Sequence, residues 1–596
     1  MKWYFQPRSD GGGAARDDDD DPPPGLLSLP AALLERHGAR VLHPGHAAVV
    51  DGYPRPRPTV YRARTLLVPD DLHQDSGFIT DVNRVLGLAG MRLELTTGDA
   101  DADLAAGDGG QQVFEDLSRL PRPAVLVPLP DYGRPVDIDA WTALQTLRAA
   151  ATVQREPTAD EASPDAEQLV IDKTNVDRIE LEHLMIGSPI TGSPVGESGG
   201  GITGGPGNGS DTSGPTTTSS YLFSGGDPRT PVAVLAKPPS RKRDATCASL
   251  YGRRPVVAVL DTGVRTHEWL DVGVNPNGGY TTSPTGFVDW DPKIQDRIRE
   301  ESERAREKGD KRRQVIRNAW DAPITDNPLI GELNEAFGHG TFIAGIVRQV
   351  APEARVLAVR VMHSDDVLYE GDIICALRHL AKRIARARPD DLVAQVDVLS
   401  LSFGYFSESA HDKVVTSGLW QAIKLLLSLG VVVVAAAGNY ATSRKFYPAA
   451  FALEPVPADQ VPVISVGALN PIGTKAVFSN DGHWVTAWAV GACVVSTYPM
   501  DADASRTPEL RIPVNRMPSG QWPPGREALD PNDYSAGFAL WSGTSFSAPY
   551  AAALIARSLL KGAKPVRSGL KLDIPGTEEK RRRAVAACNN LPRRIL

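Results

Sequence analysis

Cysteine and long apolar runs are both scarce in this sequence, and each shortage excludes a class of protein. The chain has 596 residues but only four cysteines, whose spacing fits neither a disulfide framework nor a zinc site. Two of them, Cys375 and Cys493, have apolar neighbours in the sequence and are expected in the core. No apolar run reaches the length of about 20 residues that a transmembrane helix needs, so no membrane contact is expected.

The start of the sequence also lacks the pattern of a secretory signal. Residues 1–21 have no apolar core region and end in the acidic run 17–21. Together with the scattered thiols, this favours a cytoplasmic protein, with non-classical export as the alternative.

Basic charge is in short supply, because 64 Lys and Arg residues stand against 72 Asp and Glu residues, a net charge of -8. Such a balance argues against a nucleic-acid partner. No loop places several oxygen ligands at fixed spacing, so no cofactor or metal is expected, although structural calcium stays open. The histidines His37, His43 and His46 lack acidic or cysteine ligands nearby and are expected to be ordinary surface residues.

Composition divides the chain into five segments. They are a disordered acidic and proline-rich terminus at 1–58, a small α+β domain at 60–187, a Gly/Ser/Thr-rich linker at 188–245, an α/β domain at 250–562 and a basic tail at 563–596.

Alternation of apolar and polar residues indicates strands and helices in the small domain. The expected strands are 65–68, 91–96 and 124–128, and the expected helices are 78–88 and 138–151.

The second domain has nearly continuous apolar runs separated by helical patterns. This order predicts an α/β fold with a mostly parallel sheet covered by helices on both faces. The expected strands are 256–260, 355–362, 396–403, 431–437 and 461–468, and one expected helix is 371–386.

A strongly charged insertion at 292–319 interrupts this domain. Its pairs Glu300/Arg304 and Glu307/Lys311 have helical spacing, which favours a solvated surface helix. An arm that gates substrate or docks a partner is the alternative.

Three short strings each hold one residue of a potential catalytic set. Asp261 ends the apolar run in VAVLDTGV, His339 opens a helix in GHGTFIAG, and Ser545 opens another in SGTSFSAP. A serine hydroxyl needs a base to become a nucleophile, and a carboxylate can orient that base. Open α/β sheets place such residues at the carboxyl ends of their strands.

The three strings, in this order, resemble those of the subtilisin-type serine proteases (the subtilase family, peptidase S8) over roughly residues 250–562. The string AAAGN, which ends at Asn439, also resembles a family motif. The resemblance implies a serine endopeptidase that acts through Asp261, His339 and Ser545 and an acyl-enzyme intermediate. It further implies that the side chain of Asn439 stabilises the oxyanion.

The resemblance also implies protein or peptide substrates, bound as an added strand. Phe446 falls where the family builds the floor of the P1 pocket, and filling that floor would favour small or medium apolar P1 residues over large aromatics. The alternative is that Phe446 points into the core. Tyr405 replaces a glycine that the family usually has, and could narrow a neighbouring pocket. The residues matching the substrate-binding segments are Ser402, Phe403, Gly404, Ala437 and Gly438.

Two questions stay open at the level of sequence. The domain at 60–187 is either similar to the inhibitory prodomains of many subtilases or an unrelated regulatory or recognition domain. The alternative to an active peptidase is a catalytically silent subtilase-like protein that binds peptides or regulates a partner.

Overall fold

The computed structural model describes fifteen segments of the chain, and most of the expected linker lies outside them. The described residues are 3–5, 29–96, 111–130, 132–152, 171–188, 228–283, 285–322, 324–325, 329, 331–387, 394–504, 510–513, 525–562, 577–589 and 594–595.

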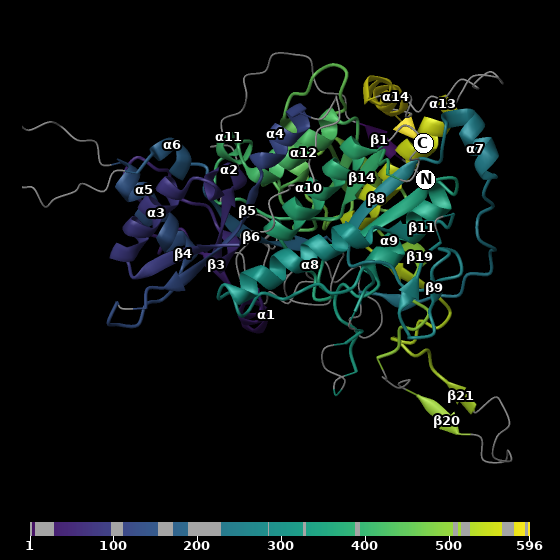
Figure 1. The fold of residues 1–596 in the computed structure, drawn as a ribbon. Helices are drawn as coiled ribbons and strands as arrows, with labels where there is room; N and C mark the ends of the chain where they lie inside the picture. Colours follow the sequence, from purple (N-terminus) through teal and green to yellow (C-terminus); the bar gives the residue numbers. More distant parts are fainter. Residues whose placement is uncertain are drawn as a thin grey trace, which may run out of the picture.

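A nine-stranded sheet forms the centre of the larger domain, with the order β11-β12-β8-β14-β16-β17-β18-β1-β23 (Figure 1). The strands from β11 to β18 are all parallel, while β1 and β23 extend the edge in antiparallel orientation. The strands of this sheet are β1 (Trp3–Phe5), β8 (Val256–Asp261), β11 (Val288–Trp290), β12 (Arg355–Arg360), β14 (Val398–Leu401), β16 (Val432–Ala436), β17 (Ile464–Leu469), β18 (Ala487–Val490) and β23 (Arg594–Ile595).

Both faces of this sheet are buried, because successive side chains of a strand point to opposite sides. In β8, Val257 and Val259 belong to one apolar cluster, whereas Ala258 and Leu260 belong to another. Helices α9 (His339–Val350) and α13 (Thr544–Gly562) cover the first face, and α10 (Glu370–Arg386) and α12 (Gly418–Ser428) cover the second. The predicted fold class is confirmed.

The remaining elements of this domain surround the sheet. The helices are α7 (Asp244–Tyr251), α8 (Pro292–Glu307), α9 (His339–Val350), α10 (Glu370–Arg386), α11 (His411–Val414), α12 (Gly418–Ser428), the 3-10 helix η5 (Ala449–Leu453), α13 (Thr544–Gly562) and α14 (Thr577–Asn589). The smaller strands are β7 (Thr230–Pro231), β9 (Gly273–Val274), β10 (Tyr280–Thr281), β13 (Val367–Tyr369), β15 (Phe403–Gly404), β19 (Val494–Thr497), β20 (Arg511–Pro513), β21 (Gly525–Glu527) and β22 (Phe538–Trp541). Among the described residues, no helix is both long and apolar enough to cross a membrane.

The N-terminal domain has an antiparallel sheet in the order β6-β3-β5-β4, and β2 pairs with β3. Helices α3 and α5 contribute to its apolar core. Its strands are β2 (Ala39–Leu42), β3 (Thr59–Pro69), β4 (Met91–Leu95), β5 (Pro121–Pro128) and β6 (Glu180–Gly187), and its helices are α1 (Ala31–Arg36), α2 (Asp70–His73), α3 (Ser76–Leu88), α4 (Gln111–Ser118), α5 (Ala140–Thr152) and α6 (Lys173–Val176).

Two local expectations, disorder before residue 58 and a buried Cys493, differ from the structure. Residues 29–58 contain α1 and β2, although their composition favoured disorder. These residues fold with few apolar side chains because Leu33, Leu34 and Val41 pack against an apolar cluster that has members from both domains. Cys493 is exposed, since it lies with a φ of 53° in the turn between β18 and β19.

The charged insertion is not a fully solvated helix. Helix α8 buries one side, including Ile294, Ile298 and Ala305, against α10 and the N-terminal domain. The expected pair of Glu300 and Arg304 is present at 3.8 Å, whereas Lys311 donates to a main-chain carbonyl of the same segment. Burial here depends on α10 and on the N-terminal domain, which are distant in the sequence, and local periodicity does not report such partners.

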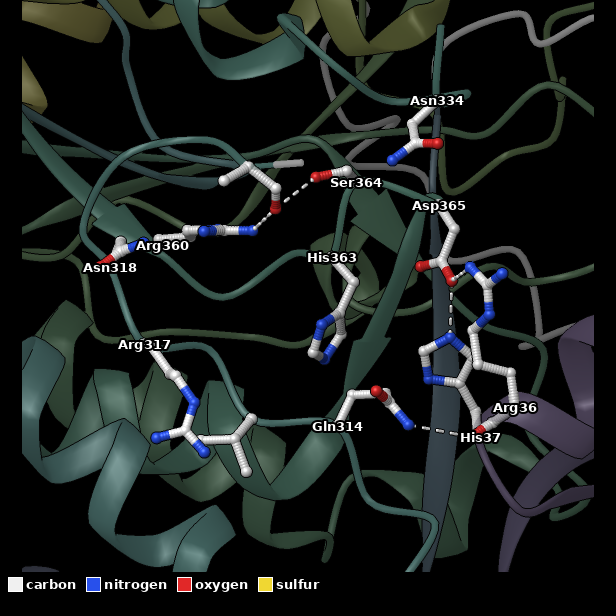
Figure 2. Close-up of a pocket in the computed structure, with 12 residues that line it drawn as sticks. Arg36, His37, Gln314, Arg317, Asn318, Asn334, Arg360, His363, Ser364 and Asp365 are labelled. Atoms are coloured by element: carbon white, nitrogen blue, oxygen red, sulfur yellow. Dashed lines mark hydrogen bonds and ion pairs between the residues drawn. The ribbon is translucent and has the colours of Figure 1, made fainter. Parts of the chain in front are cut away.

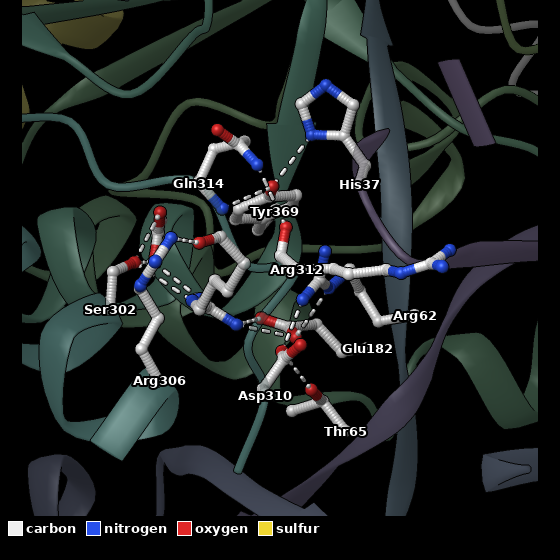
Figure 3. A network of polar contacts seen from close by, with 12 residues as sticks. His37, Arg62, Thr65, Glu182, Ser302, Arg306, Asp310, Arg312, Gln314 and Tyr369 are labelled. Carbon is white, nitrogen blue, oxygen red and sulfur yellow. Dashed lines mark hydrogen bonds and ion pairs between the residues drawn. The ribbon is translucent and has the colours of Figure 1, made fainter. Parts of the chain in front are cut away.

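A buried network of charges joins the two domains (Figure 3). Arg313 donates to Glu182 of β6 at 2.8 Å and to Asp372 of α10 at 2.6 Å, and all three side chains are inaccessible to solvent. Arg62 of β3 pairs with Asp310 in the same network. Buried charges are tolerated only when they are paired. This network at the interface of the two domains (the seam) therefore favours a docked N-terminal domain over a loosely tethered one.

Replacing Arg313 with Met should destabilise the chain by about 3–5 kcal/mol, because two buried carboxylates would lose their partner. Arg317→Ala is the matched control, since its exposed pair with Glu303 should contribute less than about 1 kcal/mol. Denaturant unfolding of the two variants measures the difference. Equal stabilities would show that the network does not hold the seam.

Candidate active site

Asp261 is the last residue of β8, a strand at the centre of the sheet, and lies at the carboxyl end where the parallel strands stop. Its Oδ1 accepts hydrogen bonds from Thr262 N at 2.8 Å and from His339 Nδ1 at 2.8 Å. The carboxylate is therefore oriented by its own turn and by the histidine ring together.

His339 is the first residue of α9, and its position depends on a close approach of two main chains. A Cβ on Gly340 would lie 2.3 Å from Gly263 O, so the start of α9 packs directly on the turn after β8. The ring is buried between Trp541 and Phe546, with centroid distances of 5.6 Å and 5.5 Å. Its Nε2 has no hydrogen-bond partner among the described residues.

Ser545 lies in the first turn of α13, next to Phe546 and hence beside the histidine ring. Its Oγ donates to Ser402 O at 3.2 Å, so the hydroxyl is not hydrogen-bonded to His339 Nε2 in this structure. Its backbone N–H donates to Ser188 O at 3.1 Å. The N-terminal end of this helix favours negative charge near the hydroxyl.

Asn439 follows β16 and points its amide at the same carbonyl oxygen. Its Nδ2 donates to Ser188 O at 2.6 Å. Its Oδ1 accepts from Thr544 N at 3.0 Å and from Thr544 Oγ1 at 2.8 Å. These two bonds assign the oxygen of the amide and direct its N–H toward Ser188.

The end of β6 fills the cleft beside these residues. It pairs antiparallel with β13 on one side and with β15 on the other, so that Gly187 faces Phe403 and Ile186 faces Gly404. Ser188 N donates to Ser402 O at 3.0 Å. A segment of the N-terminal domain therefore lies as an added strand in the predicted substrate site.

Among the predicted substrate-binding residues, Ser402, Phe403 and Gly404 contact this strand directly. Ala437 and Gly438 continue from β16 beside the cleft. Phe446 is buried and packs against Phe406 and Tyr440.

Sequence reasoning missed the second wall of the cleft, β13, and the strand that occupies it. The short apolar run at 184–186, next to the Gly-rich linker, was the available signal. It also missed the role of Tyr405, whose ring stacks on His183 of β6 at 4.3 Å.

A separate cavity of about 550 Å³ lies at the domain seam between α1 and residues 360–365 (Figure 2). Its cations already have partners: Arg36 pairs with Asp365 at 3.0 Å, and Arg360 donates to two main-chain carbonyls. His37, expected at the surface, is buried here and bonds to Asp365 and Tyr369. None of the predicted catalytic residues lines this cavity.

No group of three or more potential metal ligands occurs in the part of the chain that the structure describes. The residues of the cleft supply a carboxylate, an imidazole, a hydroxyl and two aligned N–H donors. Such a set can activate a hydroxyl and stabilise an oxyanion without a metal.

Comparison with known proteins agrees with this chemistry. A family model described as the subtilase family matches residues 252–567, slightly more than half of the chain, and the chain belongs to this family. A thermophilic serine proteinase of Bacillus sp. (strain AK1) is 33% identical over 169 residues, which are 27% of this chain and 35% of that protein. Subtilisin BL of Lederbergia lenta is 29% identical over 265 residues, 43% of this chain and 71% of that protein.

Among solved structures, fervidolysin from Fervidobacterium pennivorans, described as a keratinolytic enzyme related to subtilisin, aligns with 87% of this chain and 57% of its own. The sequence identity is 16% and the TM-score is 0.39. The chain thus spans only about a third of the length of the first relative and more than half of this structure.

Proposed function

We propose that this chain is a serine endopeptidase in which Asp261, His339 and Ser545 form the catalytic triad. The observation that carries the proposal is the environment of Ser188 O, which accepts hydrogen bonds from Asn439 Nδ2 and Ser545 N. A peptide carbonyl held by these two donors is oriented like the bond of a substrate about to be attacked.

The proposed reaction begins when the Ser545 hydroxyl turns from Ser402 O toward His339 Nε2. The Oγ–carbon bond forms as His339 takes the hydroxyl proton, and Asp261 stabilises the imidazolium. His339 then gives this proton to the leaving amine as the carbon–nitrogen bond breaks. Water hydrolyses the resulting acyl-enzyme by the same route and restores Ser545.

During both steps the carbonyl oxygen of the substrate carries negative charge. Asn439 Nδ2 and Ser545 N are already directed at this oxygen, so no reorganisation is needed when the charge develops. Substrates are protein or peptide segments in extended form, because main-chain pairing with β13 and β15 demands a strand.

Labelling with a fluorophosphonate probe tests the nucleophile on the full chain. We expect Ser545 to be modified, Ser545→Ala to be unreactive, and Ser547→Ala to be modified like the wild type. Ser547 lies on the same helix, and its hydroxyl bonds to Ala489 O instead of the cleft. A native chain whose cleft binds peptide without any labelling of Ser545 would instead be a silent peptide-binding protein.

The N-terminal domain is proposed to restrain this activity, because its strand β6 occupies the cleft. The contacts that support this include the carboxylate of Glu180, which accepts from Gly418 N at the start of α12 at 3.1 Å. His183 lies between Glu370 at 2.6 Å and Glu408 at 2.7 Å. Release of β6 would then be the step that admits a substrate.

These contacts should weaken as the pH rises. Burial alone would lower the pKa of His183, but Glu370 and Glu408 raise it from 6.5 to about 10. A raised histidine pKa stabilises the folded state fully below about pH 6.5, and this contribution is lost between pH 6.5 and 10. Burial, and after it the charge of Glu370, raises the pKa of Glu180 from 4.5 to about 8. The stability of the folded state therefore also falls as the pH rises from about 4.5 to 8, because the folded state holds this proton more tightly than the unfolded state.

Thermal unfolding of the wild type and of His183→Gln measures the effect. We expect the wild type to be more stable near pH 6 and the difference to vanish near pH 10, because glutamine keeps the hydrogen bonds without the charge. Glu408, whose pKa burial would raise but His183 lowers to about 2, stays ionised throughout this range. A constant difference across the range would contradict the assignment.

The four cysteines are all free thiols, two of them buried. This supports the proposal that the protein works in a reducing compartment such as the cytoplasm. Cell fractionation tests it, and recovery of most of the protein outside the cell would contradict it.

A further inference from the structure

The strand in the cleft defines the positions that substrate residues take. Ser188 occupies P1, the position whose carbonyl would be attacked, because its oxygen is held by Asn439 and Ser545. Gly187 therefore occupies P2. The surroundings of these two residues limit which side chains can replace them.

The space beside Gly187 is closed. A Cβ at this position would lie 2.1 Å from Asp366 Oδ1 and 3.0 Å from Met362 Cε. Gly187 does not have a positive φ, so its backbone conformation is open to any residue. The need for glycine at P2 therefore comes from the lack of space and not from the backbone.

Asp366 lies next to Gly187 because their main chains are hydrogen-bonded. Its main-chain oxygen accepts from Gly187 N at 3.1 Å, and its N–H donates to His363 O at 3.1 Å. The residue is buried with a φ of 70°, and its Oδ1 has no hydrogen-bond partner among the described residues. Burial raises the pKa of this carboxyl well above its usual value, and the nearby acids Glu335, Asp261 and Asp365 raise it further.

The space at P1 is limited by Phe446. Strands β14 and β16 pair as far as Leu401 and Ala435. Beyond them, Ser188 lies between Ser402, whose oxygen accepts from its N–H, and Asn439, whose amide donates to its oxygen. A Cβ on Gly404 would lie 2.4 Å from Phe446 Cε1, and one on Gly438 would lie 3.0 Å from Phe446 Cδ1. The ring thus fills the gap between the two walls.

This ring cannot easily withdraw. Phe446 is only 1% exposed, and its centroid lies 5.1 Å from that of Phe406 and 5.8 Å from that of Tyr440. Displacing it would disrupt an aromatic cluster packed at the density of a protein core.

We propose that Asp366 and Phe446 are specificity-determining residues, which restrict substrates to extended segments with glycine at P2 and serine, alanine or glycine at P1. The proposal rests on the proposed function for its catalytic meaning, since the same cleft is taken to cleave what it binds. The Met-Ile-Gly-Ser sequence of residues 185–188 is one segment of this class within the chain itself.

The P2 site is tested in the full chain with Gly187→Ala. The added methyl group should expel the end of β6, so we expect hydrogen exchange of residues 184–188 and fluorophosphonate labelling of Ser545 to rise roughly 10- to 100-fold, the range that overpacking produces. Gly187→Ala combined with Asp366→Gly should restore protection, because glycine frees the space and accepts a φ of 70°.

Gly87→Ala is the matched control, since a Cβ there would meet nothing within 4 Å. It should leave exchange and labelling at the wild-type level. If Gly187→Ala is protected like the wild type, or if Asp366→Gly does not rescue it, the P2 assignment is overturned.

The P1 site is tested in the same way. Ser188→Phe should expel the end of β6, and combining it with Phe446→Ala should make room for the new ring and restore protection. Phe446→Leu is a second variant in case the alanine variant fails to fold. A Ser188→Phe chain that stays protected with Phe446 in place overturns the P1 assignment.

Internally quenched peptides test the substrate class. The Gly187→Ala chain, with its cleft open, should cleave a peptide containing Ile-Gly-Ser at least about 10-fold faster, in kcat/KM, than peptides with Ile-Ala-Ser or Ile-Gly-Phe. Equal rates would overturn the specificity while leaving the peptidase intact. Exchange that follows the expected pattern without labelling or cleavage would support the two subsites but refute the catalytic function.

Discussion

Ser545→Ala should lower kcat for a peptide substrate by about five to six orders of magnitude, and His339→Ala should do the same. The magnitude is that of subtilisin, a member of the same family, where removing either residue alone costs about as much as removing the whole triad. The physical reason is that the hydroxyl and its base act as one unit. Asp261→Ala should cost less, about 10⁴-fold, because the histidine retains some ability to take the proton.

Ser547→Ala is the control for this series, because it removes a buried hydroxyl from the same helix without touching the cleft. We expect its kcat to stay within a few-fold of the wild type. Turnover by Ser545→Ala at a rate near that of the wild type would end the assignment of the nucleophile. Time-course assays with purified protein and mass-spectrometric detection of the products measure the turnover rates of the Ser545→Ala and Ser547→Ala variants.

Asn439→Ala should lower kcat about 10²- to 10³-fold with little change in KM, the loss measured in subtilisin for its oxyanion asparagine. In this chain the donor is Asn439 Nδ2, which already lies 2.6 Å from the carbonyl oxygen of Ser188. The bond strengthens as the oxygen gains charge, so it acts mainly on the transition state.

Asn439→Asp separates the loss of the N–H donor from the loss of the bonds that Asn439 Oδ1 accepts from Thr544. The aspartate keeps an oxygen for Thr544 N and Thr544 Oγ1 but has no N–H to offer the substrate. We expect a loss in kcat at least as large as that of the alanine variant, and a lower thermal stability of the full chain, because a carboxylate oxygen would then face Ser188 O. A change confined to KM in both variants would show that Asn439 only positions the substrate.

The sequence alone was sufficient for the fold class of the larger domain and for five of the nine strands of its central sheet, but it did not predict β1, β11, β18 or β23. The runs at 256–260 and 431–437 are almost continuously apolar because strands buried on both faces have no polar side. These runs coincide with β8 and β16 to within one residue at each end. Asp261, His339 and Ser545 stand in recognisable strings because each is placed by a local feature, namely a strand end or the first turn of a helix.

Other features depend on partners that are far away in the sequence. Helix α8 has the composition of a solvated helix, yet one side is buried because α10 and the N-terminal domain pack on it. His37 and Arg313 would be ordinary surface residues in isolation, and only the seam between the domains makes them buried and paired.

Only the tertiary structure revealed that residues 186–188 lie in the cleft, more than 350 positions before Ser545. An added strand is held by main-chain hydrogen bonds, which any sequence can form, so it leaves almost no pattern to recognise. The limits on P1 and P2 arise in the same way, because they are distances from Gly187 to Asp366 and from Gly404 and Gly438 to Phe446. Short local patterns in the sequence determined which residues belong to the candidate site, and the folded chain decided the occupancy and shape of this site through long-range packing.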